Sequence, residues 1–257
     1  DIFGVPSVNV IIDRICELYE FCWSYAQRQG KEITFEIGTE EQSETSSTLE
    51  ELDYTLEVIL DFCRRSNLPK PTFVVAQTGT RVMETRNIGS FDTPIRVVDE
   101  IPAEIQVPKM IEICKKSDVF LKQHNTDYLS DEALKWHPRL GIHSANVAPE
   151  FGVTETKAFI EILETNGLQS SSDDFLQLAF DSNQWEKWML PNTKATDRDR
   201  SIIAGHYIFA TKAYLELKKR VTIELKKKGL ELEKELKKSV KKSIFRYLRN
   251  FRNIRNT

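Results

Sequence analysis

The first third of the chain alternates helix-type and strand-type patterns of hydrophobic residues. Apolar side chains recur at helical spacing over residues 7–29, and Gly30 follows as a helix-stop signal. Residues 31–38 then predict a short strand and residues 48–66 a second helix. Residues 72–77 read TFVVAQ, the run of apolar residues that is typical of a fully buried strand. The pattern therefore predicts helix, strand, helix and strand in this order.

The same alternation continues in the middle of the chain. Residues 107–117 predict a helix with a proline near its first turn, and residues 118–124 predict a strand. A short helix over 131–136, a strand over 139–145 and a helix over 153–165 follow. Strands separated by helices in this way indicate βαβ units, and hence an α/β fold with a parallel sheet. The pattern alone leaves open whether the sheet is open or closed into a barrel.

Two segments depart from this alternation. Residues 78–105 are rich in turn residues and have little periodicity, apart from a candidate fifth strand over 95–98. Irregular stretches of this length are usually functional or mobile. Beyond residue 170 the pattern predicts helices only.

Composition limits the class of protein. The 257 residues are 40% hydrophobic and 29% charged, with a mean hydropathy of -0.41, which is typical of a globular protein of one or two domains. We expect no membrane span, because no run of about 18 apolar residues occurs. The first residues lack the features of a signal peptide, and the four cysteines fall in apolar helical patterns without a CxxC pair. Buried thiols in the cytoplasm are therefore expected.

The charge is unevenly distributed. Residues 218–257 contain 15 Lys and Arg against 4 Asp and Glu, although the whole chain has a net charge of -3. This segment is interpreted as a basic amphipathic helix that packs on the body of the protein or on a partner subunit. Contact with a membrane surface or a nucleic acid is the alternative, and nucleic acid is the less expected partner because the rest of the chain is acidic.

Polar residues follow the carboxyl ends of four predicted strands, in loops that cover 36–41, 77–80, 124–128 and 143–152. In α/β folds the loops at this edge of the sheet line the ligand site. Glu36, Glu40 and Glu41 offer carboxylates there, although Glu36 can equally be a solvated or ion-paired strand residue. Gln77 is a buried amide that needs partners. Gly79 permits close approach of the backbone to a ligand, or merely a turn.

His124 ends one predicted strand and Asp127 follows it shortly. Its imidazole could be a metal ligand, an acid or base, or an ordinary polar loop residue. One histidine and one glutamate fall short of the three protein ligands that a catalytic zinc normally has. The loop over 144–152 has the small residues and the following helix that would suit a phosphate. It lacks the glycine patterns of nucleotide-binding loops, so we expect no nucleotide cofactor. The remaining histidines are interpreted as structural: His137, His143 and His206.

Four of these segments together resemble the non-catalytic subunit family of tagatose-bisphosphate aldolase, which is related to the class II sugar-bisphosphate aldolases. They are FEIGTE (35–40), VVAQTGT (74–80), HNTDY (124–128) and LGIHSANVAPEFGVTETKAFIEIL (140–163). Their order and spacing agree over about residues 30–210. The resemblance implies a TIM-type (β/α)₈ barrel that handles a phosphorylated sugar at its carboxyl face, where a zinc ion held by histidines stabilises an enediolate in the catalytic relatives.

The resemblance also suggests roles for single residues. His124 is similar to a zinc ligand and a glutamate of FEIGTE to an acidic residue of the metal site, whereas Gln77 stands where another histidine is expected. That departure favours an accessory subunit. The candidate catalytic residues are Glu36, Glu40, Gln77 and His124, with His124 and Glu36 as candidate metal ligands. The candidate residues for the substrate and its phosphate are Gly79, Thr80, Asp127, Ser144, Asn146 and Ala148.

A complete barrel of this type needs about 250 residues, yet only four strands are firmly predicted. We therefore expect the C-terminal part of a barrel, with the upstream strands supplied elsewhere. The expected domains are an incomplete barrel over 1–170, a helical extension over 171–217 and a basic helix over 218–257. The expected function is an accessory subunit or a lyase that acts on a ketose phosphate through an enediolate. A non-enzymatic scaffold for a catalytic aldolase and a sugar-phosphate isomerase or epimerase are the alternatives, and a homo-oligomer or a complex with an aldolase is the expected assembly.

Overall fold

The computed structural model describes residues 7–38, 48–91 and 101–254, which divide into two compact units. The sheet unit comprises the described residues of Asp1–Thr80, Gly89–Thr126 and Lys135–Asn146. The helical unit comprises those of Arg81–Ile88, Asp127–Leu134 and Val147–Thr257. The expected domain boundaries at residues 170 and 217 stay predictions; in this division all described residues from Val147 onwards belong to the helical unit.

The sheet unit contains four parallel strands in the order β1-β2-β5-β6. They are β1 (Glu36–Gly38), β2 (Phe73–Ala76), β5 (Phe120–Gln123) and β6 (Ser144–Ala145). The α/β class with a parallel sheet is therefore confirmed, while the described residues form an open sheet of four strands. The side chains of Val74, Val75 and Ala76 are all buried, as the apolar run predicts.

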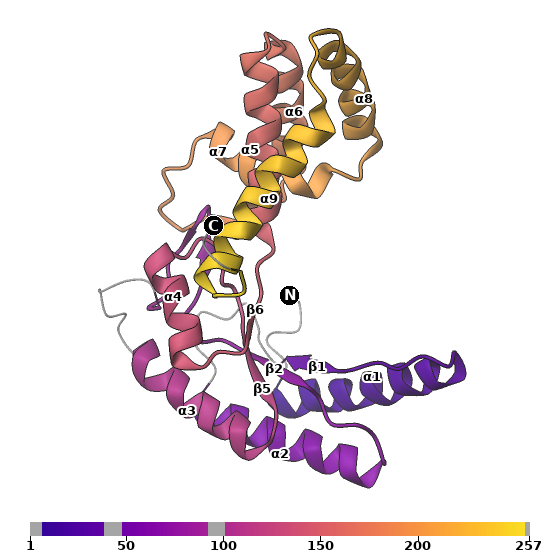
Figure 1. Cartoon of the computed structure of the whole chain (residues 1–257), viewed down its shortest axis with the longest axis vertical. Coiled ribbons are helices and arrows are strands. Elements are labelled where there is room, and N and C mark those ends of the chain that lie inside the picture. Colours follow the sequence, from indigo (N-terminus) through magenta and orange to yellow (C-terminus); the bar gives the residue numbers. More distant parts are fainter. Residues whose placement is uncertain (1–6, 39–47, 92–100, 255–257) are drawn as a thin grey trace. The chain divides into compact units, whose positions relative to one another are not determined.

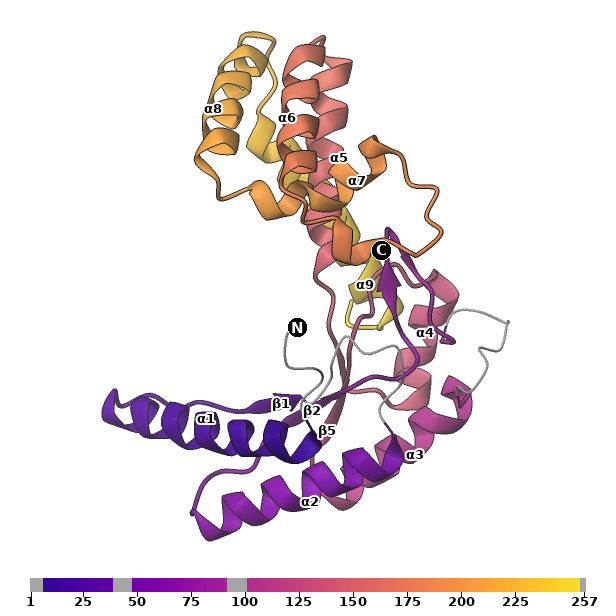
Figure 2. The same cartoon turned by 180° about the vertical axis from the view of Figure 1, so that it is seen from behind.

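Helices cover one face of this sheet. They are α1 (Val8–Arg28), α2 (Leu49–Arg65) and α3 (Ala103–Lys116), which lie along the same side of the strands (Figures 1 and 2). Their buried side chains, such as Ile12, Ile59 and Met110, form one core with Val74 and Leu121. A capping box between Thr48 and Glu51 starts α2.

The other face of the sheet carries polar residues together with Phe73, Val75 and Phe120; it is called the polar face below. Because side chains alternate along a strand, the positions that do not join the core share the opposite face. Lys122 is level with Val75 on one side and with Ser144 on the other, and it follows the core residue Leu121, so it points to the second face. His124, two residues further along β5, and Glu36, which precedes the core residue Ile37, point to the same face. The strand pattern thus separates an apolar, helix-covered face from a face that carries the polar residues.

The predicted strand over 139–145 is confirmed only at its end: Arg139 and Leu140 belong to a helix, and Ser144 and Ala145 form β6. Helix α4 spans Asp131–Leu140 and continues through Pro138, and only Ser144 and Ala145 pair with β5. Gly141 ends the helix with a φ of +85°, and its N–H donates to the carbonyl of His137. Leu140 ends the helix and Ile142 follows it, and both pack in the core of the sheet unit, so their spacing resembles that of a strand.

The irregular stretch over 78–105 contains a short antiparallel hairpin, β3 (Val82–Met83) and β4 (Arg86–Asn87), and the start of α3. The candidate strand over 95–98 lies outside the described residues. Helix α3 begins several residues before the predicted start, so Pro108 lies inside it rather than at its N-terminus.

The helical unit is built around α5 (Pro149–Thr165). Helices α6 (Gln169–Asp181), α7 (Asp197–Ala204), α8 (Lys212–Lys227) and α9 (Leu232–Asn250) pack with it, together with two 3₁₀ turns, η1 (Glu186–Trp188) and η2 (Gly205–Ile208). Figure 1 shows α9 running along α5. The rings of Phe159, Phe175 and Tyr214 pack with centroids 5.0–5.8 Å apart in its core.

The basic segment over 218–257 forms two helices rather than one. Gly229, with a φ of +77°, separates α8 from α9. Leu232 and Leu236 of α9 are buried in the same core as Val221 and Leu225 of α8, and Lys218 pairs with Glu233 at 2.6 Å. The segment therefore packs on the body of the helical unit, as one of its two interpretations expects.

Two further expectations concern membrane spans and the burial of the cysteines. Every helix in the described ranges is too short or too polar to cross a membrane. Cys63 and Cys114 are buried as expected, whereas Cys22 on α1 is exposed because it lies on the face of the helix that turns away from the core.

Candidate functional site

A hydrogen-bonded pair of polar side chains lies at the carboxyl ends of β2 and β5. Gln77 and His124 directly follow Ala76 and Gln123, which are paired in the sheet, and the N–H of His124 donates to the carbonyl of Ala76. The ladder thus continues for one residue and sets the two side chains next to each other. His124 Nδ1 lies 3.1 Å from Gln77 Oε1. Two of the four candidate catalytic residues are therefore brought together.

The environment of His124 keeps its imidazole neutral. Burial lowers the pKa of His124 below its ordinary value of 6.5. Because Gln77 presents its amide oxygen, Nδ1 carries the proton of the neutral ring and donates it to Oε1. Nε2 then carries the lone pair. A neutral imidazole with one oriented nitrogen can act as a general base or as a metal ligand.

A second polar cluster supports the same strand ends from the helix-covered face. The amide of Gln123 donates to Thr78 Oγ1 at 2.5 Å and accepts from Thr126 Oγ1 at 3.3 Å. His137 Nε2 of α4 also contacts the Gln123 oxygen. These four side chains are at most 2% exposed, so each hydrogen bond is shielded from water. The cluster fixes the backbone that presents Gln77 and His124.

Thr80 and Gly79 have structural contacts. Thr80 Oγ1 donates to the backbone carbonyl of His124 at 2.5 Å. Gly79 has a φ of +82°, and a Cβ there would lie 2.6 Å from Ser90 Oγ. A Cβ at Gly89 would lie 2.2 Å from the Gly79 carbonyl oxygen. The close backbone approach at Gly79 is thus to the segment around Gly89, which favours the turn interpretation of this glycine.

Glu36 lies at the opposite end of its strand from the Gln77–His124 pair. Its register partner is Phe73, four residues before Gln77, so the two levels are about 13 Å apart along the sheet. Both carboxylate oxygens of Glu36 accept from Lys122 Nζ, at 2.7 and 2.8 Å. The structure therefore supports the ion-paired interpretation of Glu36 and does not bring it to His124.

The described residues do not provide a zinc site. No three histidine, cysteine, aspartate or glutamate side chains within the described ranges are grouped so that they could hold a metal ion. His124 has an amide rather than a second histidine beside it, and Glu36 is bound to Lys122. Glu40 and Glu41 lie outside the described residues. The candidate ligands His124 and Glu36 therefore do not form a common site, and neither is assigned a role as a zinc ligand.

Ser144 and Asn146 lie near the pair in the sheet unit. Ser144 is level with Lys122, and the N–H of Asn146 donates to the carbonyl of Gln123 at 2.8 Å. By the alternation of side chains, both residues are placed on the polar face that carries His124. The structure thus gathers Gln77, His124, Ser144 and Asn146 from the ends of three strands.

Asp127 and Ala148 belong to the helical unit and have a different role. The N–H groups of Ala148 and Glu150, at the start of α5, both donate to Asp127 Oδ1, at 3.0 and 2.8 Å. Asp127 therefore caps α5 from a distant position in the sequence. The backbone N–H group of Ala148 that was expected to hold phosphate is occupied by this carboxylate, so the predicted cradle at the start of α5 is not formed in this arrangement.

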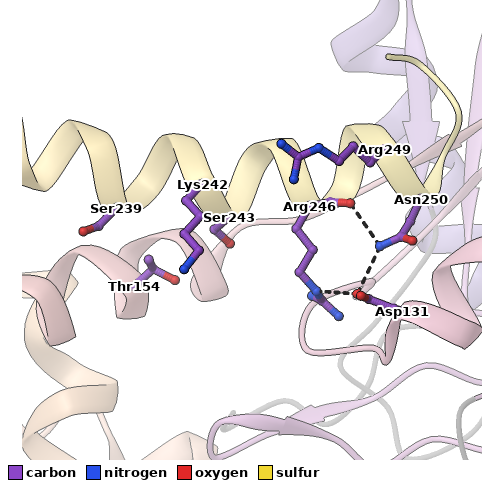
Figure 3. Close-up of a pocket in the computed structure, with 8 residues that line it drawn as sticks. All are labelled: Asp131, Thr154, Ser239, Lys242, Ser243, Arg246, Arg249 and Asn250. Atoms are coloured by element: carbon purple, nitrogen blue, oxygen red, sulfur yellow. Dashed lines mark hydrogen bonds and ion pairs between the residues drawn. The ribbon is translucent and has the colours of Figure 1, made fainter. Parts of the chain in front are cut away.

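A separate cavity lies in the helical unit beside α9 (Figure 3). It has a volume of about 540 Å³. Its lining comes from one face of α9, from Thr154 on α5 and from Asp131 at the start of α4. The α9 residues are Ser239, Lys242, Ser243, Arg246, Arg249 and Asn250. Basic and hydroxyl side chains therefore dominate this cavity.

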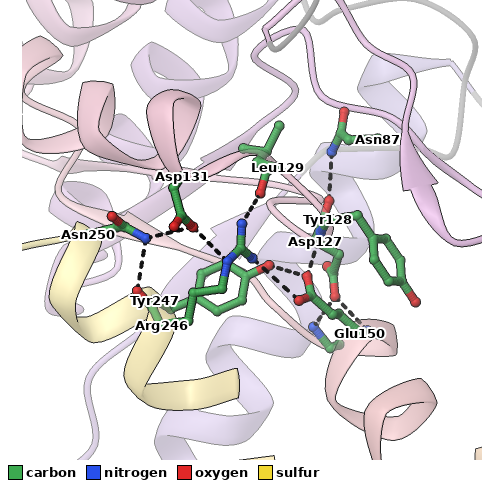
Figure 4. A network of polar contacts seen from close by, with 10 residues as sticks. Asn87, Asp127, Tyr128, Leu129, Asp131, Glu150, Arg246, Tyr247 and Asn250 are labelled. Carbon is green, nitrogen blue, oxygen red and sulfur yellow. Dashed lines mark hydrogen bonds and ion pairs between the residues drawn. The ribbon is translucent and has the colours of Figure 1, made fainter. Parts of the chain in front are cut away.

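A polar network fixes the end of α9 next to this cavity (Figure 4). Arg246 Nε pairs with Asp131 Oδ1 at 2.7 Å, and Arg246 Nη1 lies 3.5 Å from Glu150 Oε1. Glu150 Oε2 also accepts from the N–H of Tyr128 at 2.6 Å and from the hydroxyl of Tyr247. One arginine and one glutamate thus tie α9 to the starts of α4 and α5.

Burial is the largest influence on the pKa values of Asp127 and Tyr247 in this network. It raises the pKa of Asp127 to about 6, although the N–H groups of Ala148 and Glu150 act in the opposite direction. Burial also raises the pKa of Tyr247, and the neighbouring charge of Glu150 adds to the increase. The carboxyl group that caps α5 therefore titrates close to neutral pH.

Sequence reasoning missed several residues that support these sites. Gln123 and Thr78 lie one residue from His124 and Gln77, where the alternation of a strand would have placed them on the opposite, buried face. The available signal for Gln123 was its place in the alternation of β5, two residues after the buried Leu121 and so on the same, buried side. Arg246 and Glu150 gave no such signal, because their contact joins residues 96 positions apart.

Comparison with known proteins gives no match at the level of sequence: no family model matches the chain, and no curated protein does. Solved structures do match its fold. A probable tagatose 6 phosphate kinase from Sinorhizobium meliloti 1021 superposes with a TM-score of 0.65 at 12% identity, covering 96% of this chain and 68% of that one.

The fructuronate-tagaturonate epimerase UxaE from Cohnella laeviribosi, in a form with one glycerol, superposes with a TM-score of 0.60 at 12% identity. The match covers 93% of this chain and 49% of the epimerase, so this chain spans about half the length of that protein. The form with two glycerols gives a TM-score of 0.61 at 13% identity. At these identities the likeness shows a common fold. These structures are named for sugar-handling proteins, but they do not confirm the resemblance to an aldolase subunit.

Proposed function

We propose that this chain is part of a sugar isomerase or epimerase that moves a proton at a carbon next to a carbonyl group, with His124 as the base. The observation that carries the proposal is the Gln77–His124 pair at the carboxyl ends of β2 and β5. The imidazole is neutral, oriented by an amide and located where α/β folds bind their ligands. The likeness in fold to a protein named as a sugar epimerase supports the same class of reaction.

The chemistry requires two elements that the polar face of the sheet can supply. A base must remove the proton from the carbon, which leaves an enediolate with a negative charge on oxygen. In an isomerisation, His124 Nε2 takes the proton and returns it to the neighbouring carbon, while the hydroxyl proton moves between the two oxygens of the enediolate. In an epimerisation, the protonated His124 stays on its own side and a second acid on the opposite face protonates the same carbon. Asn146, which lies level with His124 on the same face, provides an amide donor for the developing oxyanion.

The proposal also covers the architecture to which the four-stranded sheet belongs. Four parallel strands with helices on one face and polar side chains on the other are the arrangement found in the wall of a (β/α)₈ barrel. We propose that the polar face is the inner side of such a wall. The substrate would then be a ketose or keto-uronate, free or phosphorylated, held at the strand ends.

Exchange of carbon-bound hydrogen with solvent tests the function. The protein is incubated in D₂O with a panel of ketoses, ketose phosphates and keto-uronates, and deuterium at the carbons next to the carbonyl is followed by NMR. We expect His124→Gln to lower the exchange rate about 100-fold or more. His143→Gln, a change at an exposed histidine, is the matched control and should exchange like the wild type. Equal exchange by His124→Gln and wild type would remove His124 from the reaction, and no exchange with any sugar counts against the function.

A non-catalytic subunit of an aldolase is the second candidate. It is favoured by the amide of Gln77 in place of a histidine and by the missing three-ligand group within the described ranges. Elemental analysis and co-purification distinguish the two. Stoichiometric zinc that is lost in His124→Ala indicates a lyase, whereas an absence of exchange together with a co-purifying aldolase indicates the accessory subunit.

A further inference from the structure

The cavity beside α9 is lined by positive charge that the described residues do not fully neutralise. Of its three basic side chains, only Arg246 has acidic partners, which are Asp131 and Glu150. Lys242 and Arg249 form no ion pair with the described residues, and Arg249 has only the ring of Phe245, 6.0 Å from its guanidinium carbon. With Asp131 counted, the lining carries a net charge of +2.

Hydroxyl groups in the same cavity also lack protein partners. Ser239 and Ser243 of α9 and Thr154 of α5 line the cavity, and their side chains make no hydrogen bond within the described parts of the chain. In Figure 3 Lys242 extends from α9 towards Thr154, with Ser243 beside it. Helices α5 and α9 therefore both present hydrogen-bond donors to this cavity.

An anion bound here would relieve repulsion between cations along α9. Lys242 and Arg246 are four residues apart on α9, and Arg246 and Arg249 are three apart, so like charges neighbour each other along one helix face. Such pairs destabilise a helix. The network around Arg246 holds this face of α9 against α4 and α5, and the exposed side chains of Lys242 and Arg249 line the cavity without an acidic partner among the described residues.

We propose that the cavity binds a small molecule with a phosphate monoester group. A dianionic phosphate matches the net charge of +2, and its oxygens are strong acceptors for ammonium, guanidinium and hydroxyl donors. A volume of about 540 Å³ exceeds a single phosphate ion and is in the range of sites for small metabolites. The monoanionic diesters of a nucleic acid match the charge less well. The site lies wholly in the helical unit, and the proposal goes beyond the function assigned to His124.

Titration calorimetry at low ionic strength tests the site on the full chain. The probes are inorganic phosphate, a hexose 6-phosphate and the unphosphorylated hexose. We expect saturable binding of the two phosphates, no binding of the free hexose, and tighter binding of the ester. Lys242→Ala and Arg249→Ala should each weaken binding of the ester about 10-fold, and the double variant should abolish it.

Lys237→Ala is the matched control, because Lys237 is an exposed lysine of α9 that does not line the cavity. It should bind the ester like the wild type. His124→Gln should also bind it normally, so that a failure of the proposed reaction and a failure of this site are distinguishable. Unchanged binding by the double variant, with circular dichroism that confirms its fold, would overturn the proposal. Tighter binding of a short oligonucleotide than of the ester would overturn it as well, in favour of a nucleic-acid surface.

Discussion

At the residue scale, the partner of each titratable group decides what the group can do. Glu36 and His124 both project from the polar face, yet Glu36 is held by Lys122 whereas His124 is held by an uncharged amide. An amide orients the ring without favouring its charged form, so burial alone sets the direction of the pKa shift. Gln77 is therefore a positioning residue for His124.

The first prediction concerns Gln77→Glu. A carboxylate next to His124 Nδ1 favours the imidazolium, so the pKa of His124 should rise relative to the wild type. NMR titration of the histidine ring protons measures the shift directly, without an activity assay. If the enzyme acts as proposed, the acidic limb of kcat/KM should move to higher pH in parallel, because only the neutral ring accepts a proton.

Gln77→Leu is the companion variant. It keeps the size of the side chain but removes the acceptor of Nδ1–H, so both tautomers become available and kcat should fall. A pKa of His124 that stays the same in Gln77→Glu would show that the two side chains do not interact in solution.

The second prediction concerns Asp127, whose pKa is raised from 3.8 to about 6. Because the folded form holds its proton more tightly than the unfolded chain, the associated stability is present below pH 4 and is lost as the pH rises through 6. Asp127→Asn keeps an oxygen for the N–H groups of Ala148 and Glu150 but carries no charge. It should raise the unfolding free energy at pH 8 by about 2 kcal/mol and flatten its dependence on pH between 4 and 7. Urea unfolding at several pH values measures both.

Asp127→Ala separates the cap from the charge. It removes the acceptor altogether, so the start of α5 should lose about 1 kcal/mol from the missing cap. A steeper rather than flatter pH dependence in Asp127→Asn would mean that the carboxyl group titrates below its ordinary range in the folded protein.

At the element scale, the periodicity of apolar residues predicted those helices and strands whose ends are determined by residues nearby in the sequence. The helices that became α1 and α2 and the buried strand β2 differ from their predicted ranges by one or two residues, because their apolar spacing and end signals lie within the segment. The alternation of β5 likewise placed His124 beside Gln77, and this part of the candidate site could be predicted.

Elements whose ends depend on distant contacts could not be predicted in this way. Helix α5 begins at Pro149 rather than 153, because the carboxylate of Asp127 caps it from 21 residues away. The strand over 139–145 was predicted from Leu140 and Ile142, which instead pack at the end of α4. The loop expected to hold phosphate was judged from its small residues, and nothing local indicates that Asp127 would occupy its N–H groups.

The third prediction tests the contact between η2 and α5. Gly205 has an ordinary helical φ, but a Cβ there would lie 2.4 Å from Thr156 Cγ2 and 2.7 Å from its hydroxyl oxygen. Gly205→Ala should therefore lower the unfolding free energy by about 2 kcal/mol, as expected for overpacking of a core. Thermal and urea unfolding measure the loss.

The matched control removes the side-chain atoms of Thr156 that a Cβ at residue 205 would meet. In the Thr156→Ala background the two shortest contacts are gone and only the 3.1 Å approach to Phe175 Cζ is left, so Gly205→Ala should cost less there than in the wild type. Equal costs in both backgrounds would show that the contact with Thr156 is not what requires a glycine.

At the scale of the whole molecule, the described residues form two hydrophobic cores. One joins Val74 and Leu121 of the sheet to α1, α2 and α3, and the other is formed by Phe159, Phe175 and Tyr214 with the surrounding helices. The chain passes between the two units several times, so the domain division could not be read from a change in composition along the sequence. The likeness to longer sugar-handling proteins covers both units but only about half of the epimerase.

The last prediction follows from the two cores. Phe175 is fully buried and packs 5.0 Å from Phe159, so Phe175→Ala should cost about 3–5 kcal/mol in the helical unit. Hydrogen exchange should then accelerate in α5, α6 and α8, while the amides of β2 and β5 keep their protection. Ile59→Ala, in the core of the sheet unit, should give the opposite pattern. If either change lowers protection equally throughout the chain, the two cores open as one cooperative unit, and variants of the α9 cavity would have to be checked for effects on the Gln77–His124 pair as well.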